Sequence, residues 1–305
     1  MGFRTIFVKD GEKLNLKLDN LQVKKHGETY TIPLEDIQSI ILEGYDTVIT
    51  TRLLARLSKY HIPIVVCDQS YLPTGIFLEL SQYHRASKRV QHQAKWSQEM
   101  KDLVWQKIIQ MKVGNQLWVA KKLSKDLARI DKMQYLLDEI EPGDPTNREG
   151  HVAKLYFNAI YGVGFSRDMD YIENLYMDYG YSIIRSQIAK DIVAMGLQPA
   201  LGIFHKNEYN AFNLVDDLME PFRPIMDWYI HTKIIDENNY LTYDKRLKII
   251  NFLNQTMRIK GRNQLIYQIT IDYIRSFIKV MEENNLELLM NIRIEDWVES
   301  DKNEV

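Results

Sequence analysis

The hydrophobic pattern of the chain changes near residue 80, and this change limits the folds that are open to it. Before that point, short segments are separated by turn signals such as Asp10-Gly11. The segments read RTIFV, KLNLKL, LQVKK, TYTIP and IQSIIL, which is typical of β-strands. Residues 51–60 have helical spacing through Leu53 and Leu57 and precede the apolar strand segment IPIVVC. We therefore predict an antiparallel β-domain that carries one helix.

Beyond residue 80 the chain consists mainly of long helical periods rich in Lys, Gln, Leu, Ile and Met. Breaks are expected at Gly162, at Gly196 and at Lys260-Gly261, because glycine ends helices readily. The candidate helices cover residues near 87–112, 115–139, 147–161, 171–196, 212–233, 243–258 and 262–284. The predicted α+β fold has three parts, namely an antiparallel β-domain at residues 1–80, a linker at 81–86 and an all-helical domain at 87–305.

The composition indicates the compartment in which such a chain works and the kind of nucleic-acid site it can have. One cysteine, Cys67, cannot form an intramolecular disulfide, and no charged-then-apolar signal peptide is visible before Phe3, so we expect a cytoplasmic location. No apolar run approaches the roughly 18 residues of a membrane helix, so no membrane association is expected. The net charge of −2 argues against DNA binding by the whole surface. Any nucleic-acid site should therefore be a local patch.

An acidic stretch, NLVDDLMEPFRP at residues 213–224, has the spacing of a helix with one charged side. Leu214 and Leu218 form an i, i+4 apolar pair, which predicts that one face of this helix is packed. Three acids lie off that face, namely Asp216, Asp217 and Glu220. Like charges this close repel one another unless a cation neutralises them. A solvated acidic face and a metal-binding face explain this stretch equally well.

Two neighbours of Glu220 affect what its carboxylate can do. Arg223 is the nearest cation that could neutralise the acids. Pro221 disfavours helical geometry in the residue before it, so we expect Glu220 at a kink or a helix start.

Glu149 and His205 give weak signals when each is taken alone. Glu149 lies in the first turn of a predicted helix whose N-cap is Asn147, where an acid ordinarily offsets the helix dipole. His205 ends the apolar run LGIFH and lies between predicted core and solvent, where most histidines are structural. Together with Glu220, they would supply one imidazole and two carboxylates. That donor set suits a divalent metal that acts on a nucleic-acid backbone.

Four ordered motifs resemble a known family, the CRISPR adaptation integrases, which are metal-dependent CRISPR-associated endonucleases that insert new spacers. The motifs are NREGHVAKLYF around Glu149, NLYMDYGYSIIRSQI at 174–188, QPALGIFH up to His205 and NLVDDLMEPFRP up to Pro224. They span most of the helical region. The length of the chain and its pattern of residue types are most similar to the type II group. The resemblance makes the helical region the catalytic domain.

The resemblance also implies site residues and an activity. Glu149, His205 and Glu220 are implied to bind Mg²⁺ or Mn²⁺, although many family members have aspartate where this chain has Glu220. Arg223 matches the family arginine, and Asp217 is expected to support the ligands. Residues that line the site are expected to be Asn158, Tyr161 and Tyr179. The implied reaction inserts short double-stranded DNA into a CRISPR array by attack of a 3′-hydroxyl on a phosphodiester, in antiviral defence.

The same resemblance implies partners. The expected assembly is a homodimer formed through the β-domain, bound to a small ferredoxin-like adaptation partner. In type II systems the effector nuclease and a DNA-clamping accessory protein are also expected. The DNA partners are the double-stranded prespacer and the CRISPR repeat.

Basic runs mark candidate DNA contacts on a slightly acidic chain. The candidates are Arg85, Lys88, Arg89, Arg258, Lys260 and Arg262. Each run could equally be a solvated helix face. Two other functions use the same residues: a hydrolytic metal nuclease that activates water, and a non-catalytic DNA-binding scaffold whose acidic cluster is structural.

Overall fold

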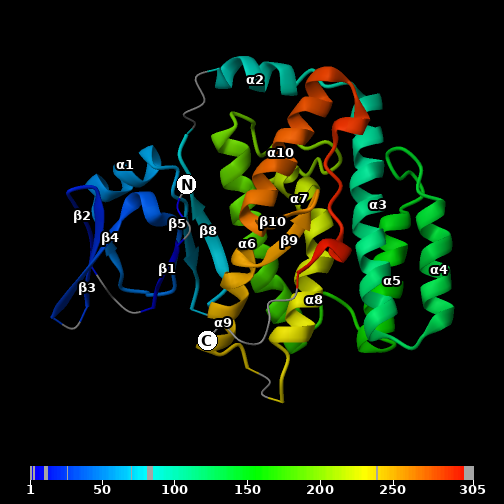
Figure 1. Cartoon of the computed structure of the whole chain (residues 1–305), viewed down its shortest axis with the longest axis horizontal. Helices are drawn as coiled ribbons and strands as arrows, with labels where there is room; N and C mark the ends of the chain where they lie inside the picture. The colour runs from blue at the N-terminus through cyan, green and yellow to red at the C-terminus, as the bar shows by residue number, and fades with distance from the viewer. Residues whose placement is uncertain are drawn as a thin grey trace. The chain divides into compact units, whose positions relative to one another are not determined.

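The computed structural model describes residues 2, 4–9, 13–25, 27–69, 71–80, 85–237 and 240–298 (Figure 1). Most of the predicted linker at 81–86 lies outside these residues, as do Phe3, Asp10-Gly11 and the chain beyond residue 298. Two compact units are present: Met1–Val90 with Ala189–Leu197, and Gln91–Ile188 with Gln198–Val305. Each unit is described separately below.

The first unit contains two four-stranded sheets and one helix. One sheet has the order β1 (Arg4–Val8), β5 (Ile37–Leu42), β7 (Ile64–Cys67), β8 (Pro73–Phe77). The other has the order β4 (Glu28–Pro33), β3 (Asn20–Lys25), β2 (Lys13–Lys17), β6 (Val48–Ile49). Helix α1 (Thr51–Lys59) begins after Thr50, whose hydroxyl accepts a hydrogen bond from the amide of Leu53. Apolar side chains from both sheets and from α1 form a single core, among them Val8, Leu14, Leu21, Ile40, Leu53 and Leu57.

The α+β fold class is confirmed, but the prediction that the β-domain is antiparallel is wrong for part of each sheet. Strands β2, β3 and β4 pair antiparallel, as do β7 and β8. Strand β5 pairs parallel with both β1 and β7, and β2 pairs parallel with β6. Helix α1 lies between β5 and β7 in the chain and makes a crossover connection, which parallel neighbours require. All six residues of β5 are buried. Burial of every residue, on both faces of the strand, is typical of a parallel strand.

The second unit is mainly helical. Its long helices include α3 (Gln98–Leu123), α4 (Leu127–Asp138) and α5 (Arg148–Tyr161), which lie side by side (Figure 1). Two helices, α2 (Ala86–Gln93) and α6 (Ile172–Ala194), contribute residues to both units. The other helices are α7 (Asn213–Met219), α8 (Arg223–Lys233), α9 (Tyr243–Ile250) and α10 (Ile266–Glu283). No helix in the described ranges is long and apolar enough to cross a membrane.

Two sequence predictions for this unit are wrong. The expected break between residues 112 and 115 is absent, because α3 continues through Gly114 and ends at Leu123. The domain is also not all-helical, since residues 256–265 form the hairpin of β9 (Thr256–Ile259) and β10 (Arg262–Leu265). The turn residues Lys260 and Gly261 both have positive φ, 49° and 78°. That geometry belongs to a two-residue hairpin turn rather than a helix end.

Candidate active site

The centre of the site is a buried lysine that joins two carboxylates from different helices. Lys112 lies in the middle of α3, and its ammonium forms an ion pair with Glu149 Oε1 of α5. The same Nζ atom lies 2.5 Å from Glu220 Oε2, in the short 3₁₀ helix η2 (Glu220–Phe222). Glu149 and Glu220, which lie far apart in the chain, therefore meet at one point. No local sequence pattern singled out Lys112.

Glu149 is held by its backbone at the start of α5. The amides of Arg148 and Glu149 donate to the two carboxylate oxygens of Asp144, at 2.8 and 2.9 Å. Asn147 caps the helix through its side-chain oxygen, which accepts from Gly150 N at 3.2 Å, as its sequence position predicted. These caps fix the first turn of α5, and the Glu149 side chain remains 28% exposed.

Glu220 lies at a proline kink, as the sequence predicted. Helix α7 ends at Met219, η2 follows, and α8 begins at Arg223. Pro221 and Pro224 lack backbone N–H groups, so a regular helical ladder cannot continue through this segment. The carbonyl of Pro221 instead accepts a hydrogen bond of 2.9 Å from Asn115 Nδ2 on α3. The kink directs the buried carboxylate of Glu220 toward Lys112.

Arg223 provides a second positive charge for Glu220. Its Nε lies 3.0 Å from Glu220 Oε1, and its guanidinium lies 4.6 Å from the centroid of the Tyr181 ring. Burial raises the pKa of Glu220, but the charges of Arg223 and Lys112 outweigh burial and hold this pKa below its ordinary value. The two oxygens of Glu220 therefore face different cations, Oε1 the guanidinium of Arg223 and Oε2 the ammonium of Lys112.

His205 is oriented by Asp217. The fully buried carboxylate of Asp217 accepts hydrogen bonds from the amides of residues 203, 204 and 205, at 2.7, 3.1 and 3.0 Å. Asp217 Oδ1 also lies 2.6 Å from His205 Nδ1, so Nε2 is the ring nitrogen left for a ligand. Gly202 permits this tight loop, because a Cβ there would lie 2.4 Å from the carbonyl oxygen of His205.

The charges of nearby acids also act on the imidazole. The hydrogen bond to Asp217 raises the pKa of His205, burial lowers it, and the charges of Asp217 and Glu220 raise it further. Behind the loop, Trp105 of α3 stacks on Phe204, with ring centroids 4.2 Å apart. Helix α3 therefore supports both the histidine loop and the carboxylate pair.

The donor set is suitable for a divalent cation, although these side chains do not form a closed ligand cage. Within the ranges that the structure covers, no group of three His, Cys, Asp or Glu side chains lies close enough together to hold a metal. The two carboxylates that come closest are joined by the ammonium of Lys112. Two carboxylates and an imidazole suit Mg²⁺ or Mn²⁺ chemically, and Lys112 occupies the point that the two carboxylates share.

Comparison with known proteins identifies the family. The family model described as CRISPR associated protein Cas1 matches residues 6–270. The chain belongs to the Cas1 family. A curated relative, the CRISPR-associated endonuclease Cas1 of Neisseria meningitidis, is 39% identical over 227 residues, which cover 74% of each protein. The Cas1 2 endonuclease of Pyrobaculum aerophilum is 26% identical over 83% of this chain and 90% of its own length. The Neisseria match is consistent with the predicted type II grouping.

Solved structures show the same fold. A casposase bound to its integration product superposes with a TM-score of 0.73 at 18% identity, covering 98% of this chain and 96% of the casposase. A Cas1 protein from Thermotoga maritima gives a TM-score of 0.72 at 18% identity and covers 92% of this chain and 97% of its own. The shared Cas1 fold thus extends over both units of the chain.

Asp216 of this Cas1-family chain is paired rather than part of a solvated acidic face. Both of its oxygens bind Arg185 of α6, each at 2.8 Å. Asn210 donates to the same carboxylate at 2.7 Å. The three acids of the stretch therefore have three different partners. Asp216 pairs with Arg185, Asp217 with His205, and Glu220 with Lys112 and Arg223.

Two of the predicted lining residues lie further along α5 than Glu149 does. Asn158 and Tyr161 lie about 13 and 18 Å beyond Glu149 along the axis of α5, from the rise of an α-helix. Asn158 accepts a hydrogen bond of 2.9 Å from Gly164 N, and Tyr161 stacks on Phe165. Tyr179 is fully buried in α6. These contacts stabilise the helices and the loop after α5, and none of them involves the carboxylate pair.

The predicted DNA-binding residues lie on two elements. Arg258, Lys260 and Arg262 are exposed on the β9–β10 hairpin. A groove of about 960 Å³ beside this hairpin is lined by five basic side chains, Lys260, Arg262, Arg275, Lys279 and Arg293. On α2 and just before it, Arg85 and Lys88 are exposed, whereas Arg89 Nη1 donates to the carbonyl of Met195 at 2.8 Å.

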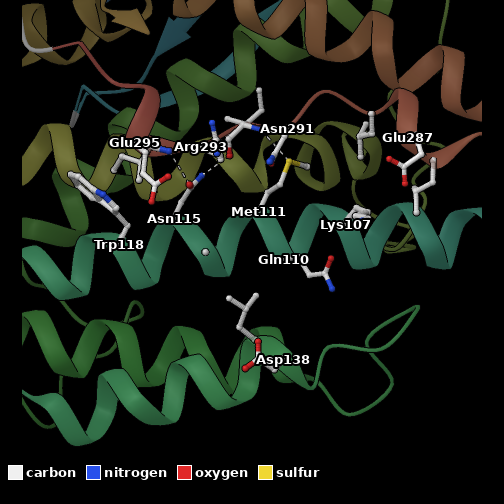
Figure 2. A pocket seen from close by; sticks show the side chains of 16 residues that line it. Lys107, Gln110, Met111, Asn115, Trp118, Asp138, Glu287, Asn291, Arg293 and Glu295 are labelled. Atoms are coloured by element: carbon white, nitrogen blue, oxygen red, sulfur yellow. Dashed lines mark hydrogen bonds between the residues drawn. The ribbon is translucent and has the colours of Figure 1, made fainter. Parts of the chain in front are cut away.

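A second groove, of about 700 Å³, follows one side of α3 (Figure 2). Its floor includes Met111, Asn115 and Trp118, and its far wall is the segment 286–295. Asn115 Oδ1 accepts from Ile294 N at 2.9 Å, and its Nδ2 donates to the Ile292 carbonyl at 3.1 Å (Figure 2). By helical periodicity, Lys112 lies on the other side of α3. The carboxylate site is therefore separate from this groove.

Proposed function

We propose that this Cas1-family protein is a metal-dependent DNA integrase that inserts short double-stranded DNA into a CRISPR array. One observation carries the proposal: two carboxylates from separate helices converge on a single cation. The charge of one of them, Glu220, acts on the His205 imidazole, whose Nδ1 is held by a buried aspartate. Family membership supports a nuclease or integrase, and the casposase whose fold matches was captured with its integration product.

Glu149, Glu220 and Nε2 of His205 would hold a Mg²⁺ or Mn²⁺ ion. When bound, the ion supplies Lewis-acid polarisation of the scissile phosphate and stabilises the leaving oxygen. The nucleophile in integration is a 3′-hydroxyl of DNA, so the chain itself needs no nucleophilic side chain. Its own residues position ligands and balance charge.

Three side chains would carry out these supporting tasks. Asp217 fixes His205 so that Nε2 faces outward, which is the usual role of a carboxylate behind a metal-binding histidine. Arg223 neutralises Glu220 and keeps it ionised, while the Tyr181 ring holds the guanidinium in place. These contacts support a neutralising role for Arg223 over direct contact with the phosphate.

The DNA path would follow the basic hairpin. Phosphate contacts make binding depend on salt, because each contact releases condensed counterions. Replacing Arg258, Lys260 and Arg262 together with glutamine should lower the slope of log affinity against log salt by roughly 2 to 3, measured by fluorescence anisotropy with duplex DNA. The matched control replaces Lys121, Lys122 and Lys125 with glutamine. These lysines lie at the end of α3 and just after it. An unchanged slope in the hairpin variant would remove this surface from the DNA path.

The assembly is proposed by analogy with the relatives. One structural neighbour is a Cas6-RT-Cas1–Cas2 complex, which this chain matches with a TM-score of 0.71 at 18% identity, over 97% of this chain and 36% of that one. We expect a homodimer through the β-domain and a small ferredoxin-like partner that corresponds to Cas2. The effector nuclease and the DNA-clamping accessory protein remain further expected partners.

An in vitro integration assay tests the proposal. The protein, with its small partner, would receive DNA with free 3′-hydroxyl ends and a supercoiled target that contains a CRISPR repeat. We expect joined products with Mn²⁺, none with EDTA, and a loss of at least about a hundredfold in Glu149→Ala, which lacks one ligand. Glu99→Ala is the matched control, since Glu99 also lies in the first turn of a helix but is exposed.

The assay also separates the alternatives. Cleavage without joining would indicate a hydrolytic nuclease that activates water at the same residues. DNA binding with no metal-dependent product would indicate a non-catalytic scaffold. Full activity of a folded Glu149→Ala variant would end the metal-site proposal.

A further inference from the structure

Lys112 is an unusual residue for its position. It lies at the centre of a 26-residue helix, and only 6% of its surface is exposed. Lysine is almost never buried unless its charge is paired. Its neighbours one turn away on the same side of α3, Ile108 and Gln116, are buried as well. The ammonium is therefore enclosed by protein, and its contacts with Glu149 and Glu220 determine where it lies.

The two carboxylates need a cation in order to meet. Glu149 projects from α5 and Glu220 from η2, and without a counter-charge their mutual repulsion in a partly buried site would drive them apart. The ammonium of Lys112 contacts an oxygen of each glutamate. The lysine thus supplies the counter-charge at the point where the two acids converge.

The charges of this cluster are already balanced. Lys112 and Arg223 match the two negative charges of Glu149 and Glu220. A divalent ion that bound both glutamates would meet the ammonium at the same oxygens, since Lys112 Nζ lies 2.5 Å from Glu220 Oε2. Two cations cannot share that position, because they repel strongly at contact distance.

We propose that Lys112 is a positioning residue that holds Glu149 and Glu220 together in the metal-free protein and competes with the divalent cation for their oxygens. The inference rests on the proposed function of this site. Metal binding then requires the ammonium to leave at least one carboxylate, which its flexible four-carbon stem allows. Metal loading also leaves the cluster with excess positive charge, which favours binding of a DNA phosphate.

Lys112→Met tests the competition, because methionine keeps an unbranched apolar side chain and removes the charge. The full-length variant should bind Mn²⁺ at least tenfold more tightly than wild type, measured from free Mn²⁺ by electron paramagnetic resonance. In EDTA its melting temperature should fall by several degrees, and saturating Mn²⁺ should restore most of that loss. Lys107→Met is the matched control, since Lys107 is an exposed lysine on the same helix, and it should match wild type in both measurements.

A double-mutant cycle tests the positioning role without any metal. In EDTA, Lys112→Met and Glu149→Gln should be strongly non-additive in their effects on stability, because each removes the same ion pair. Lys112→Gln, which keeps a polar head group, serves for the cycle if Lys112→Met does not fold. Additive effects would overturn the positioning role.

The outcomes distinguish this inference from the proposed function. If wild type integrates DNA with Mn²⁺ but Lys112→Met binds Mn²⁺ no more tightly, the competition is overturned and the integrase proposal stands. If neither protein binds Mn²⁺, both proposals are overturned. If only Lys112→Met binds Mn²⁺ measurably, the competition is supported.

Discussion

Glu220 and Asp227 are two buried carboxylates seven residues apart, and they titrate in opposite directions. Glu220 is 5% exposed and Asp227 is 3% exposed. The pKa of Glu220 lies below its ordinary value, whereas burial raises the pKa of Asp227 from 3.8 to about 6. Burial acts in the same direction on both groups, so their partners make the difference.

The partners of Glu220 are cations, and those of Asp227 are phenols. Asp227 accepts hydrogen bonds from Tyr181 at 2.5 Å and from Tyr156 at 3.0 Å. These bonds lower the pKa of Asp227 but do not offset burial, even with help from the charges of Arg167 and Arg223. The comparison teaches that burial alone does not mark a reactive carboxylate. Of the two, only the acid paired directly with cations keeps a pKa below its ordinary value.

The largest expected effect is a difference in joining activity between variants of Glu220 and Asp227. Glu220→Gln should reduce metal-dependent joining on the order of a thousandfold, because metal stabilisation of the transition state is worth several kcal/mol. Asp227→Asn, which keeps shape and hydrogen-bonding capacity, should retain most of the activity. Both are measured in the integration assay. Equal losses in two well-folded variants would contradict the assigned difference.

The next effect concerns the pH dependence of stability. Because the folded pKa of Asp227 is about 6 and its ordinary value is 3.8, the folded protein binds the proton more tightly. The contribution of Asp227 to the free energy of unfolding is therefore fully present below about pH 4. It falls by about 3 kcal/mol as the pH rises to about 6. Asp227→Asn should remove that loss, so its stability relative to wild type should rise between pH 4 and 7. Urea unfolding followed by tryptophan fluorescence measures both proteins.

Glu220→Gln should show the opposite sign in the same experiment. The folded pKa of Glu220 is lowered, so its contribution is present above its ordinary pKa and is lost as the pH falls. A variant whose stability relative to wild type rose on going from pH 4 to pH 7 would refute the assignment of charged partners to Glu220.

A smaller effect is expected at Asp217, which supports a ligand without being one. Asp217→Asn should weaken Mn²⁺ binding about tenfold to a hundredfold, because the amide cannot hold His205 in the same tautomer. Metal titration measures this change, with Asp216→Asn as the neighbouring control. If the two variants bind Mn²⁺ equally well, Asp217 has no such role.

The sequence predicted most of the residues that meet at this site, but it did not predict the lysine that balances their charges. Glu149, Glu220, Asp217 and Arg223 were found from their motifs, and Pro221 correctly predicted the kink. Lys112 was missed because its partners are 37 and 108 residues away in the chain, and no local pattern reports a contact between distant helices. One signal was available: Ile108, Lys112 and Gln116 follow i, i+4 spacing, which places a lysine on a buried helix face.

The sequence predicted most of the helices and strands correctly, but it did not predict the direction in which the strands pair. Alternating and apolar segments identified strands, but strand direction depends on the connection, and the crossover through α1 makes β5 and β7 parallel. The hairpin at 256–265 was read as helix because Lys260-Gly261 marks either a helix end or a tight turn. Tertiary context decides between those two outcomes.

The side-chain amide of Asn115 connects the Glu220 segment with the segment at residues 292–294. It binds the Pro221 carbonyl beside Glu220, and it also binds the backbone of Ile292 and Ile294. A protein shortened before residue 292 would keep every proposed ligand, yet it would leave the Asn115 oxygen without its partner and open the wall that covers it. Shortened variants made for crystallisation or fusion should therefore retain the chain through Ile294.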